Sequence, residues 1–472
     1  MQPTKANLRL VIYNIILVCI FSLISHREKL VSLLQTEQLE RIDGLYLEIR
    51  RKDPQRGKNP WLRESLFNRG EVDPDHFFTP DDLHYLKNLS RKRPKFEHEG
   101  DNAFLDIETK KAALKASSSV VALLSYTTGD QELNQCSGVI IENDDNNAHI
   151  VLTSANLIWR LTQEDVMEHS LADILKVIIH LYDGGSYQGE GCAYDFHYNI
   201  AWIRFQSDRS LPAASLRQLD DCININPAMD NKSFHIRPHS THFSLIPGHT
   251  IVVVGRYFAK PFDLMAAPGQ FTLARCDFDC KELFMGTCQT TKCGEGGALI
   301  NLSGEVIGIT FYYEYGFTTP FMPINIAQKC WEHYKRYGGL RRPSLGVEVT
   351  NFYTAAIYHL EKVIQKIPSI CNGVLVEKVI QGSCADSAGL HLKDVIVQCG
   401  GKTVHSFLEF LEMVWDKKVG DVLQLSVVRA SQNDPIHVNM VVDEVAVEKF
   451  NLGHGTSEAD EVRAAAVILT FV

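Results

Sequence analysis

The sequence lacks the cysteine spacing of a zinc site. Its twelve cysteines are scattered over 472 residues, with no C-x-x-C pair and no run of cysteine and histidine ligands. Structural zinc sites usually take two ligands from one short run of that kind. Scattered cysteines are more typical of reduced, partly buried thiols than of a disulfide framework. We therefore expect no metal site and no cofactor, and mostly reduced cysteines.

An excess of positive charge is also absent. The formal net charge is -10, which disfavours broad binding to nucleic acid. Hydrophobic residues make up 45% of the chain and charged residues 22%, values typical of a folded soluble protein. The length exceeds that of one ordinary core, so we expect two or more domains.

No apolar run has the length of a usual membrane span. The longest candidate, Leu10–Ile24, has about fifteen residues where a spanning helix needs about twenty. Lys5 and Arg9 precede it, and no small-residue cleavage site follows. Residues 1–26 could therefore form an uncleaved membrane anchor, a poor signal peptide or a buried helix.

Residues 27–115 have the composition of a charged extension or linker, with prolines scattered among many charges. The basic cluster Ser90–Lys95 could be a nuclear-import signal or a solvated face of that linker. The localisation therefore stays open between a membrane-anchored, a nuclear and a cytoplasmic protein.

Short runs rich in valine and isoleucine fill residues 116–339. Examples are "SSVVALLSY", "AHIVLTSA", "NIAWIRF" and "EVIGITFYY", separated by turn residues. Such a series predicts an all-β barrel or sandwich. It ends in "INIAQKCWEHYKRYGG", a helical stretch closed by Gly338 and Gly339.

A different pattern covers residues 340–447, where strands alternate with short helices. The stretch "SFLEFLEMVWDKK" predicts an amphipathic helix with Phe407, Phe410, Leu411 and Val414 on one face. Residues 448–472 form a C-terminal tail.

Residues 116–447 resemble the Deg/HtrA (protease Do-like) family, in which a trypsin-like domain is followed by a PDZ domain. The motifs that carry the resemblance are "VLTSAN", "YNIAWIRF", "GEGGALINLSGEVIGI" and "GSCADSAGLHLKDVIVQCGGKTV". It implies a mainly β fold: a chymotrypsin-like double β-barrel (116–339), then a PDZ domain (340–447). It also implies a homo-oligomer, usually a trimer.

All three positions of the catalytic triad differ from the family pattern. The family's histidine follows the Val-Leu-Thr strand by two small residues, and "VLTSAN" has Asn156 there. The family's aspartate precedes Ile-Ala on a strand, where this chain has Asn199. The nucleophilic serine between glycines is replaced by Glu295. The resemblance therefore predicts a pseudoprotease.

The chemistry agrees with that prediction. An amide has no basic lone pair near neutral pH, so Asn156 cannot act as the general base. Glu295 lacks the attacking hydroxyl and would bring negative charge to the place where the oxyanion develops. Cys293 and Gly294 depart from the family's oxyanion loop, whose backbone N–H donors are expected at Cys293 and Glu295.

Other nucleophiles or bases could have taken over. His149, His197, Ser154 and Cys293 all lie near the relevant motifs, although nothing in their spacing requires a catalytic pair. The most specific enzymatic alternative is a rebuilt dyad of Cys293 and His197. In the other interpretation, all four residues have structural roles.

The PDZ-like part keeps its binding elements. Such domains add a peptide as a strand between one strand and one helix, and hold its terminal carboxylate on loop N–H groups. By resemblance the donors are Leu345, Gly346 and Val347, and the groove lies beside Phe407, Phe410 and Leu411. The tail ends in Thr-Phe-Val, so Val472 could occupy this groove itself or simply pack elsewhere.

These features favour a non-catalytic Deg/HtrA-like homologue that binds peptides or protein C-termini through its PDZ domain. Two alternatives remain. One is a serine- or cysteine-type endopeptidase with a rearranged active site that acts on unfolded proteins, and the other is a gene product without a selected function.

Overall fold

The computed structural model describes residues 104–444, except 128–129, 145, 161–169, 172–175, 228–240, 275–279, 312–317, 340–342 and 433. The predictions for Leu10–Ile24, Ser90–Lys95 and the Val472 tail lie outside the described residues. In the part that the structure describes, no helix is both long and apolar enough to span a bilayer. The ten cysteines in that part are thiols, as the sequence analysis expects.

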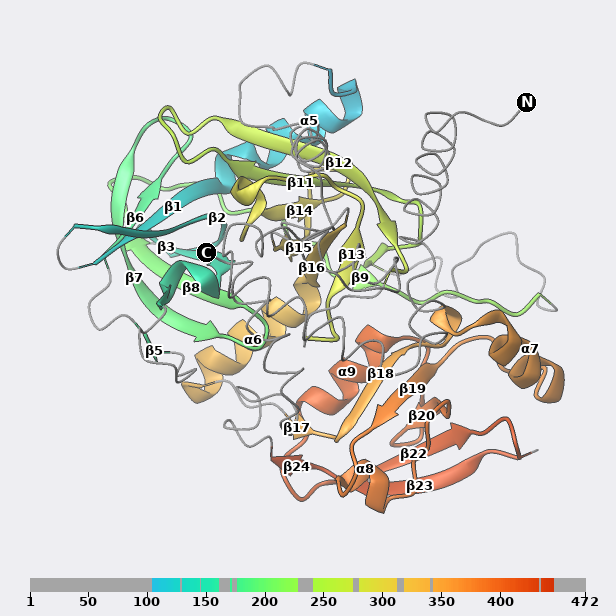
Figure 1. Cartoon of the computed structure of the whole chain (residues 1–472). Helices are drawn as coiled ribbons and strands as arrows, with labels where there is room; N and C mark the ends of the chain where they lie inside the picture. The colour runs from blue at the N-terminus through green and yellow to red at the C-terminus, as the bar shows by residue number, and fades with distance from the viewer. Residues whose placement is uncertain are drawn as a thin grey trace, which may run out of the picture. The chain divides into compact units, whose positions relative to one another are not determined.

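Two closed barrels of six strands form the trypsin-like part (Figure 1). The first has the strand order β1-β2-β3-β8-β7-β6 and the second β11-β12-β13-β16-β15-β14. The described strands of the first are β1 (Val120–Tyr126), β2 (Glu132–Asn143), β3 (Ala148–Ser154), β6 (Lys176–His180), β7 (Ser186–Asp195) and β8 (Ile200–Gln206). Those of the second are β11 (Thr250–Arg256), β12 (Leu264–Thr272), β13 (Phe284–Gly286), β14 (Ala298–Ile300), β15 (Val306–Thr310) and β16 (Thr319–Pro323). The predicted mainly β double barrel is confirmed.

Valine and isoleucine fill these strands because both faces are covered. The six residues of β1 from Val120 to Ser125 are all buried, as are all five of β15. Branched side chains pack well on such pleated surfaces. Short two-stranded pairs complete this part: β4 (Trp159–Arg160) with β5 (Ser170–Leu171), and β9 (Leu219–Asp220) with β10 (Phe243–Ser244).

Helix α6 (Ile324–Tyr337) follows the second barrel, as predicted. It ends because Gly338 adopts a left-handed conformation with φ 68° and donates its N–H to the Tyr334 carbonyl. On its inner face Trp331 stacks on Trp202 of β8, with ring centroids 5.6 Å apart. The helix therefore shares a core with the first barrel.

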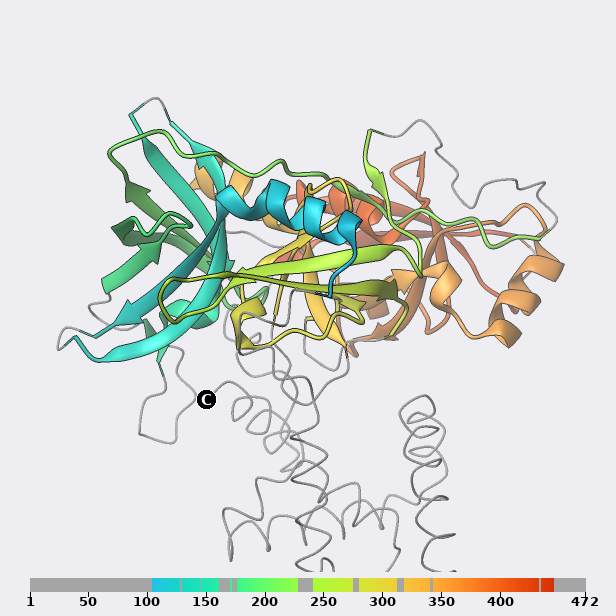
Figure 2. The ribbon, with the colours of Figure 1, turned by 90° about the horizontal axis from the view of Figure 1, so that it is seen from above.

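Helix α5 (Ile107–Ala116) lies within the stretch that the sequence analysis assigned to the charged extension. Asp106 caps its N-terminus by accepting a hydrogen bond from the Thr109 N–H. Its small buried face, Ala112, Ala113 and Ala116, rests on β11, β12 and β14, along which it runs in Figure 2. The lysines among these alanines gave the segment the composition of a linker, so the folded part begins before residue 116.

A five-stranded path, β18-β19-β20-β22-β23, forms the second part, with β21 on the side of β20. The described elements are β17 (Pro343–Ser344), β18 (Val347–Asn351), α7 (Ile357–Lys366), β19 (Val374–Val379), α8 (Cys384–Ser387), β20 (Val395–Cys399), β21 (Lys402–Thr403), α9 (Phe407–Trp415), β22 (Val422–Val428), β23 (Ile436–Val441) and β24 (Asp443–Glu444). Helix α9 starts at a motif related to the capping box, in which the second bond goes to the residue before the N-cap. Ser406 accepts from the Glu409 N–H, and the Glu409 carboxylate accepts from the His405 N–H.

Candidate functional site

The three predicted triad positions meet in the structure. Asn156 lies on the 3₁₀ turn Ala155–Ile158 after β3, Asn199 in the turn between β7 and β8, and Glu295 just after the turn Lys292–Gly294. Asn156 Nδ2 donates to Glu295 Oε1 at 3.1 Å, and Asn199 Nδ2 lies 3.5 Å from the same oxygen. The site therefore consists of one carboxylate between two amides.

The Asn199 oxygen ties the turn between β7 and β8 to the end of β3. It accepts from Ser154 Oγ at 2.9 Å and from the Asn156 N–H at 3.2 Å. Asn199 has φ 50°, a left-handed conformation that asparagine tolerates better than most residues. Ser154 is fully buried, so its hydroxyl serves this network.

The side chain of Glu295 is buried, so its carboxylate depends on the hydrogen bonds that it accepts. Glu295 is only 3% exposed, and a buried carboxylate needs hydrogen bonds to remain in the fold. The amides of Asn156 and Asn199 supply them. The observed residues therefore complement one another, with two amide groups facing one carboxylate oxygen.

The loop before Glu295 uses its own N–H groups. The Cys293 N–H donates to Thr291 Oγ1, the Gly294 N–H to the Thr291 carbonyl at 2.8 Å, and the Glu295 N–H to the Lys292 carbonyl at 3.0 Å. Both expected oxyanion donors, at Cys293 and Glu295, thus have partners inside the turn. An oxyanion hole needs such donors aimed at the reacting oxygen.

Neighbouring residues hold this loop in place. Ser137 Oγ donates to the Cys293 carbonyl at 2.7 Å, and Thr310 Oγ1 donates to the Gly294 carbonyl at 2.6 Å. A Cβ atom at Gly294 would lie 2.0 Å from Thr290 Oγ1, so a larger residue requires the loop to move.

The other candidate bases are engaged elsewhere. The two ring nitrogens of His149 lie 2.8 Å from Asn143 Oδ1 and 2.8 Å from Ser207 Oγ. Burial lowers the pKa of His149. His197 Nε2 lies 3.6 Å from Glu282 Oε2. His149 is therefore a structural histidine, and His197 faces a carboxylate of the second barrel.

Of the predicted carboxylate loop, Leu345 and Gly346 lie between β17 and β18, and Val347 is the first residue of β18. Gly346 has φ 64°, and a Cβ atom there would lie 2.1 Å from Ser383 Cβ, so only glycine fits. The Gly346 carbonyl accepts from Ser383 Oγ at 3.2 Å, and the Leu345 carbonyl accepts from Cys384 Sγ. The loop is thus fixed by the turn that leads into α8.

The predicted groove helix α9 divides its apolar residues between two cores. Phe410 is fully buried in the core of its own domain. Phe407 is 4% exposed and packs with the second-barrel core, its ring 6.3 Å from Phe284. Leu411 and Val349 of β18 are partly buried against the same core. The strand and helix that would flank a peptide therefore face the barrel.

A buried aspartate fixes this contact. Asp221 follows β9, and its Oδ2 accepts from Asn351 Nδ2 at 2.7 Å and from the Leu408 N–H at 3.4 Å. Burial raises the pKa of Asp221 to about 6, against the hydrogen bonds that lower it. Nothing in the local sequence around Asp221 signals this role, because its partners lie 130 and 187 residues away.

Three ligand-type side chains meet where the sequence analysis expects no metal site. His197, Cys280 and Glu282 place their donor atoms within 4.8 Å of one another. Their separation along the chain hides the group from a search for short motifs.

Comparison with known proteins agrees with this architecture. Residues 136–309 match the trypsin-like peptidase domain, and residues 343–440 match the PDZ domain. A trypsin-like domain followed by a PDZ domain makes the chain similar to Deg/HtrA proteases. Among its relatives are "Putative protease Do-like 14" of Arabidopsis thaliana, 26% identical over 65% of this chain and 64% of that one, and mouse "Serine protease HTRA4", 26% identical over 56% and 51%.

The chain thus spans less than two thirds of the length of these curated relatives. Among solved structures, the "HtrA-type protease AlgW with tripeptide" matches 71% of this chain and 97% of that one, with 17% identity and a TM-score of 0.46. A serine endoprotease from Yersinia pestis matches 72% and 99%, with 18% identity and a TM-score of 0.40.

Proposed function

We propose that this Deg/HtrA-like protein has no peptidase activity and binds peptides or protein C-termini through its PDZ domain. The observation that carries the proposal is the buried Glu295 carboxylate between the amides of Asn156 and Asn199. This group contains neither a hydroxyl or thiol nucleophile nor a base that could activate one.

The oxyanion loop supports the same proposal. Both expected donors, the N–H groups of Cys293 and Glu295, bond within the turn. Stabilisation of the oxyanion is commonly the largest single contribution to acyl-transfer catalysis, about 3–4 kcal/mol per donor. A chain with a restored nucleophile would therefore still lack this stabilisation of the oxyanion.

The PDZ domain supports the second part of the proposal, the binding of peptides or protein C-termini. The fixed loop at Leu345 and Gly346 leads into strand β18, which begins at Val347, in the arrangement that captures a terminal carboxylate in other PDZ domains. Because β18 and α9 face the second barrel, a ligand has to compete with that contact. We therefore propose that partner binding opens the contact, in a homo-oligomer such as the trimer that the family resemblance implies.

A second candidate is a serine- or cysteine-type endopeptidase with a rearranged site. It rests on the relatives that are named proteases and on the thiol of Cys293 beside the loop. An alkylating probe that depends on an activated thiolate distinguishes the two functions. Labelling of Cys293 at a rate above that of Cys192, another partly buried thiol, would favour this candidate.

Peptide binding tests the proposed function directly. A library of apolar C-terminal peptides is titrated against the full chain and against a chain lacking residues 464–472. We expect binding by peptides with a free carboxylate, loss of binding when the same peptides are amidated, and tighter binding after truncation if the tail occupies the groove. Equal binding of acid and amide forms would contradict carboxylate capture.

A further inference from the structure

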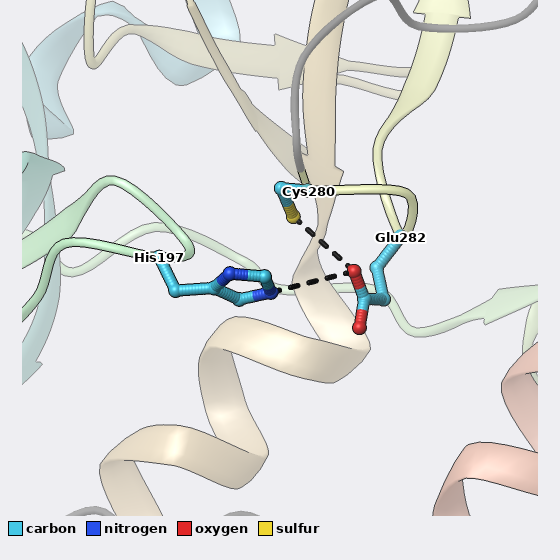
Figure 3. Close-up of side chains that lie close together, drawn as sticks. All are labelled: His197, Cys280 and Glu282. Atoms are coloured by element: carbon cyan, nitrogen blue, oxygen red, sulfur yellow. Dashed lines mark hydrogen bonds and ion pairs between the residues drawn. The ribbon is translucent and has the colours of Figure 1, made fainter. Parts of the chain in front are cut away.

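Three side chains from the two barrels converge on one point (Figure 3). His197 belongs to the turn between β7 and β8, whereas Cys280 and Glu282 belong to the connection between β12 and β13. Glu282 Oε2 lies 3.6 Å from His197 Nε2 and 3.4 Å from Cys280 Sγ. The three potential ligand atoms all lie within 4.8 Å of one another.

These separations suit a shared ion. Zinc binds nitrogen, oxygen and sulfur at about 2.0–2.3 Å in tetrahedral geometry, which holds neighbouring ligand atoms about 3.3–3.6 Å apart. The two distances from Glu282 Oε2 agree with these tetrahedral edges. The third separation, between a ring nitrogen of His197 and Cys280 Sγ, is at most 4.8 Å, so these two side chains would have to approach each other to share one ion.

Glu282 is the shared partner of the other two side chains: its Oε2 accepts a hydrogen bond from Cys280 Sγ and forms an ion pair with His197 Nε2. A bound ion would replace both contacts. A second His–Glu pair, His405 Nδ1 and Glu409 Oε2 at 2.8 Å, belongs to no group of three ligands among the described residues.

The ligand chemistry selects zinc. Imidazole and thiolate are poor ligands for magnesium and calcium, and the mixed set of nitrogen, sulfur and oxygen suits zinc. Cys280 is 5% exposed, and the side chains of His197 and Glu282 are 13% and 24% exposed. The site is thus sheltered but reachable, and three protein ligands leave the fourth position to water.

Zinc binds the thiolate form of cysteine, so zinc binding would release one proton from the Cys280 thiol to solvent.

We propose that His197, Cys280 and Glu282 bind a zinc ion that fastens the first barrel to the second. The ion would also order the turn that carries Asn199, two residues from His197. Tyr198 in this turn stacks on Trp415 of α9 at 5.8 Å, so the same ion would support the contact with the PDZ domain.

Cobalt substitution tests the site on the full chain. The protein is stripped with a chelator and titrated with Co²⁺, which reports a tetrahedral thiolate site by a sulfur-to-cobalt charge-transfer band. We expect one equivalent to bind, zinc to displace it, and zinc to raise the Tm. Cys280→Ser should abolish the band, and His197→Ala and Glu282→Gln should each weaken binding by more than about 100-fold, exceeding the loss from changes behind the ligands.

Matched variants separate this site from the other thiols and histidines. Cys192→Ser removes a partly buried thiol of β7, and His405→Ala removes the other His–Glu pair, so both should leave the titration unchanged. A charge-transfer band that survives Cys280→Ser, or a Tm that zinc does not raise in the unsubstituted chain, would overturn the proposal and leave an ordinary ion pair. If Cys280→Ser fails to fold, the nearly isosteric Glu282→Gln serves as the test. Weaker cobalt binding by this variant would support the proposal, and unchanged binding would overturn it.

Discussion

We infer that a carboxylate between two amides lacks both the hydroxyl nucleophile and the histidine base of a serine-protease triad. Glu295, Asn156 and Asn199 form such a group, and its members are mutually consistent: two donors for one buried acceptor. This consistency supports the proposal that the three residues replace the triad as a set. It also means that single reversions would create buried mismatches.

Restoring the triad residue types should therefore fail to restore good catalysis. In the variant Asn156→His, Asn199→Asp, Glu295→Ser, the Cys293 and Gly294 loop still bonds its own N–H groups. We expect kcat/KM on an unfolded substrate to remain at least about 10²–10³-fold below that of an active relative, the loss that follows removal of one oxyanion donor. Activity equal to the relative's would show that the loop rearranges freely.

Asp221 should make stability depend on pH. Its pKa is about 6 in the folded chain and 3.8 ordinarily, so the folded state binds the proton more tightly. The stabilisation is complete below the ordinary pKa and is lost as the pH rises through about 6. Urea unfolding of the parent and Asp221→Asn at about pH 4.5 and 7.5 should show the parent losing on the order of 2 kcal/mol relative to the variant. A constant difference would contradict a raised pKa.

At the scale of elements, the strand runs, α6 and α9 could all be predicted, because branched residues between turns and apolar residues at helical spacing are local signals. Helix α5 could not, since its buried face consists of alanines among lysines. The meeting of Asn156, Asn199 and Glu295 could be expected by family resemblance. Asp221 and the group His197, Cys280 and Glu282 depend on contacts between distant segments, for which the sequence carries no local pattern.

Arg256 at the end of β11 joins the second barrel to the start of the first. Its guanidinium donates to the carbonyls of Val120 at 2.6 Å, Ser117 at 2.8 Å and Phe262 at 2.9 Å, and the residue is 3% exposed. Burial lowers its pKa to about 10, so it stays charged at neutral pH.

Replacement of Arg256 should weaken the contact between the second barrel and the start of the first. Arg256→Met leaves three carbonyl acceptors without their charged donor and should lower the free energy of unfolding by about 3–5 kcal/mol. Arg204→Met, on an exposed arginine of β8, should change it by less than about 0.5 kcal/mol. Denaturant unfolding measures both, and equal losses would contradict the specific role of Arg256.

For the whole molecule, we propose that the contact between the PDZ domain and the barrels controls access to the peptide groove. At the end of α9, Asp416 faces Lys329 Nζ at 3.0 Å and His333 Nε2 at 3.1 Å, both on α6. These pairs add to the buried contacts of Phe407 and Trp415. A ligand that needs the open groove has an apparent Kd equal to its intrinsic Kd divided by the fraction of open molecules.

Reversing the charge of Asp416 should therefore tighten peptide binding. Asp416→Lys replaces attraction to Lys329 by repulsion, worth about 1 kcal/mol at this half-exposed position, so the apparent Kd of a C-terminal peptide should fall about fivefold. Glu361→Lys, on the exposed side of α7, should leave the Kd unchanged. Calorimetric titration of the full chain compares the three proteins, and an unchanged or higher Kd in Asp416→Lys would contradict closure of the groove.

The central claim is the absence of peptidase activity, and turnover of an unfolded substrate tests it most directly. Fluorescent casein is incubated with the full chain, with Cys293→Ala and with an active Deg/HtrA relative under the same conditions. We predict that the chain and Cys293→Ala both release product at the rate of buffer alone, while the relative cleaves. Release above buffer by the chain that disappears in Cys293→Ala would contradict the account and establish a cysteine-type peptidase.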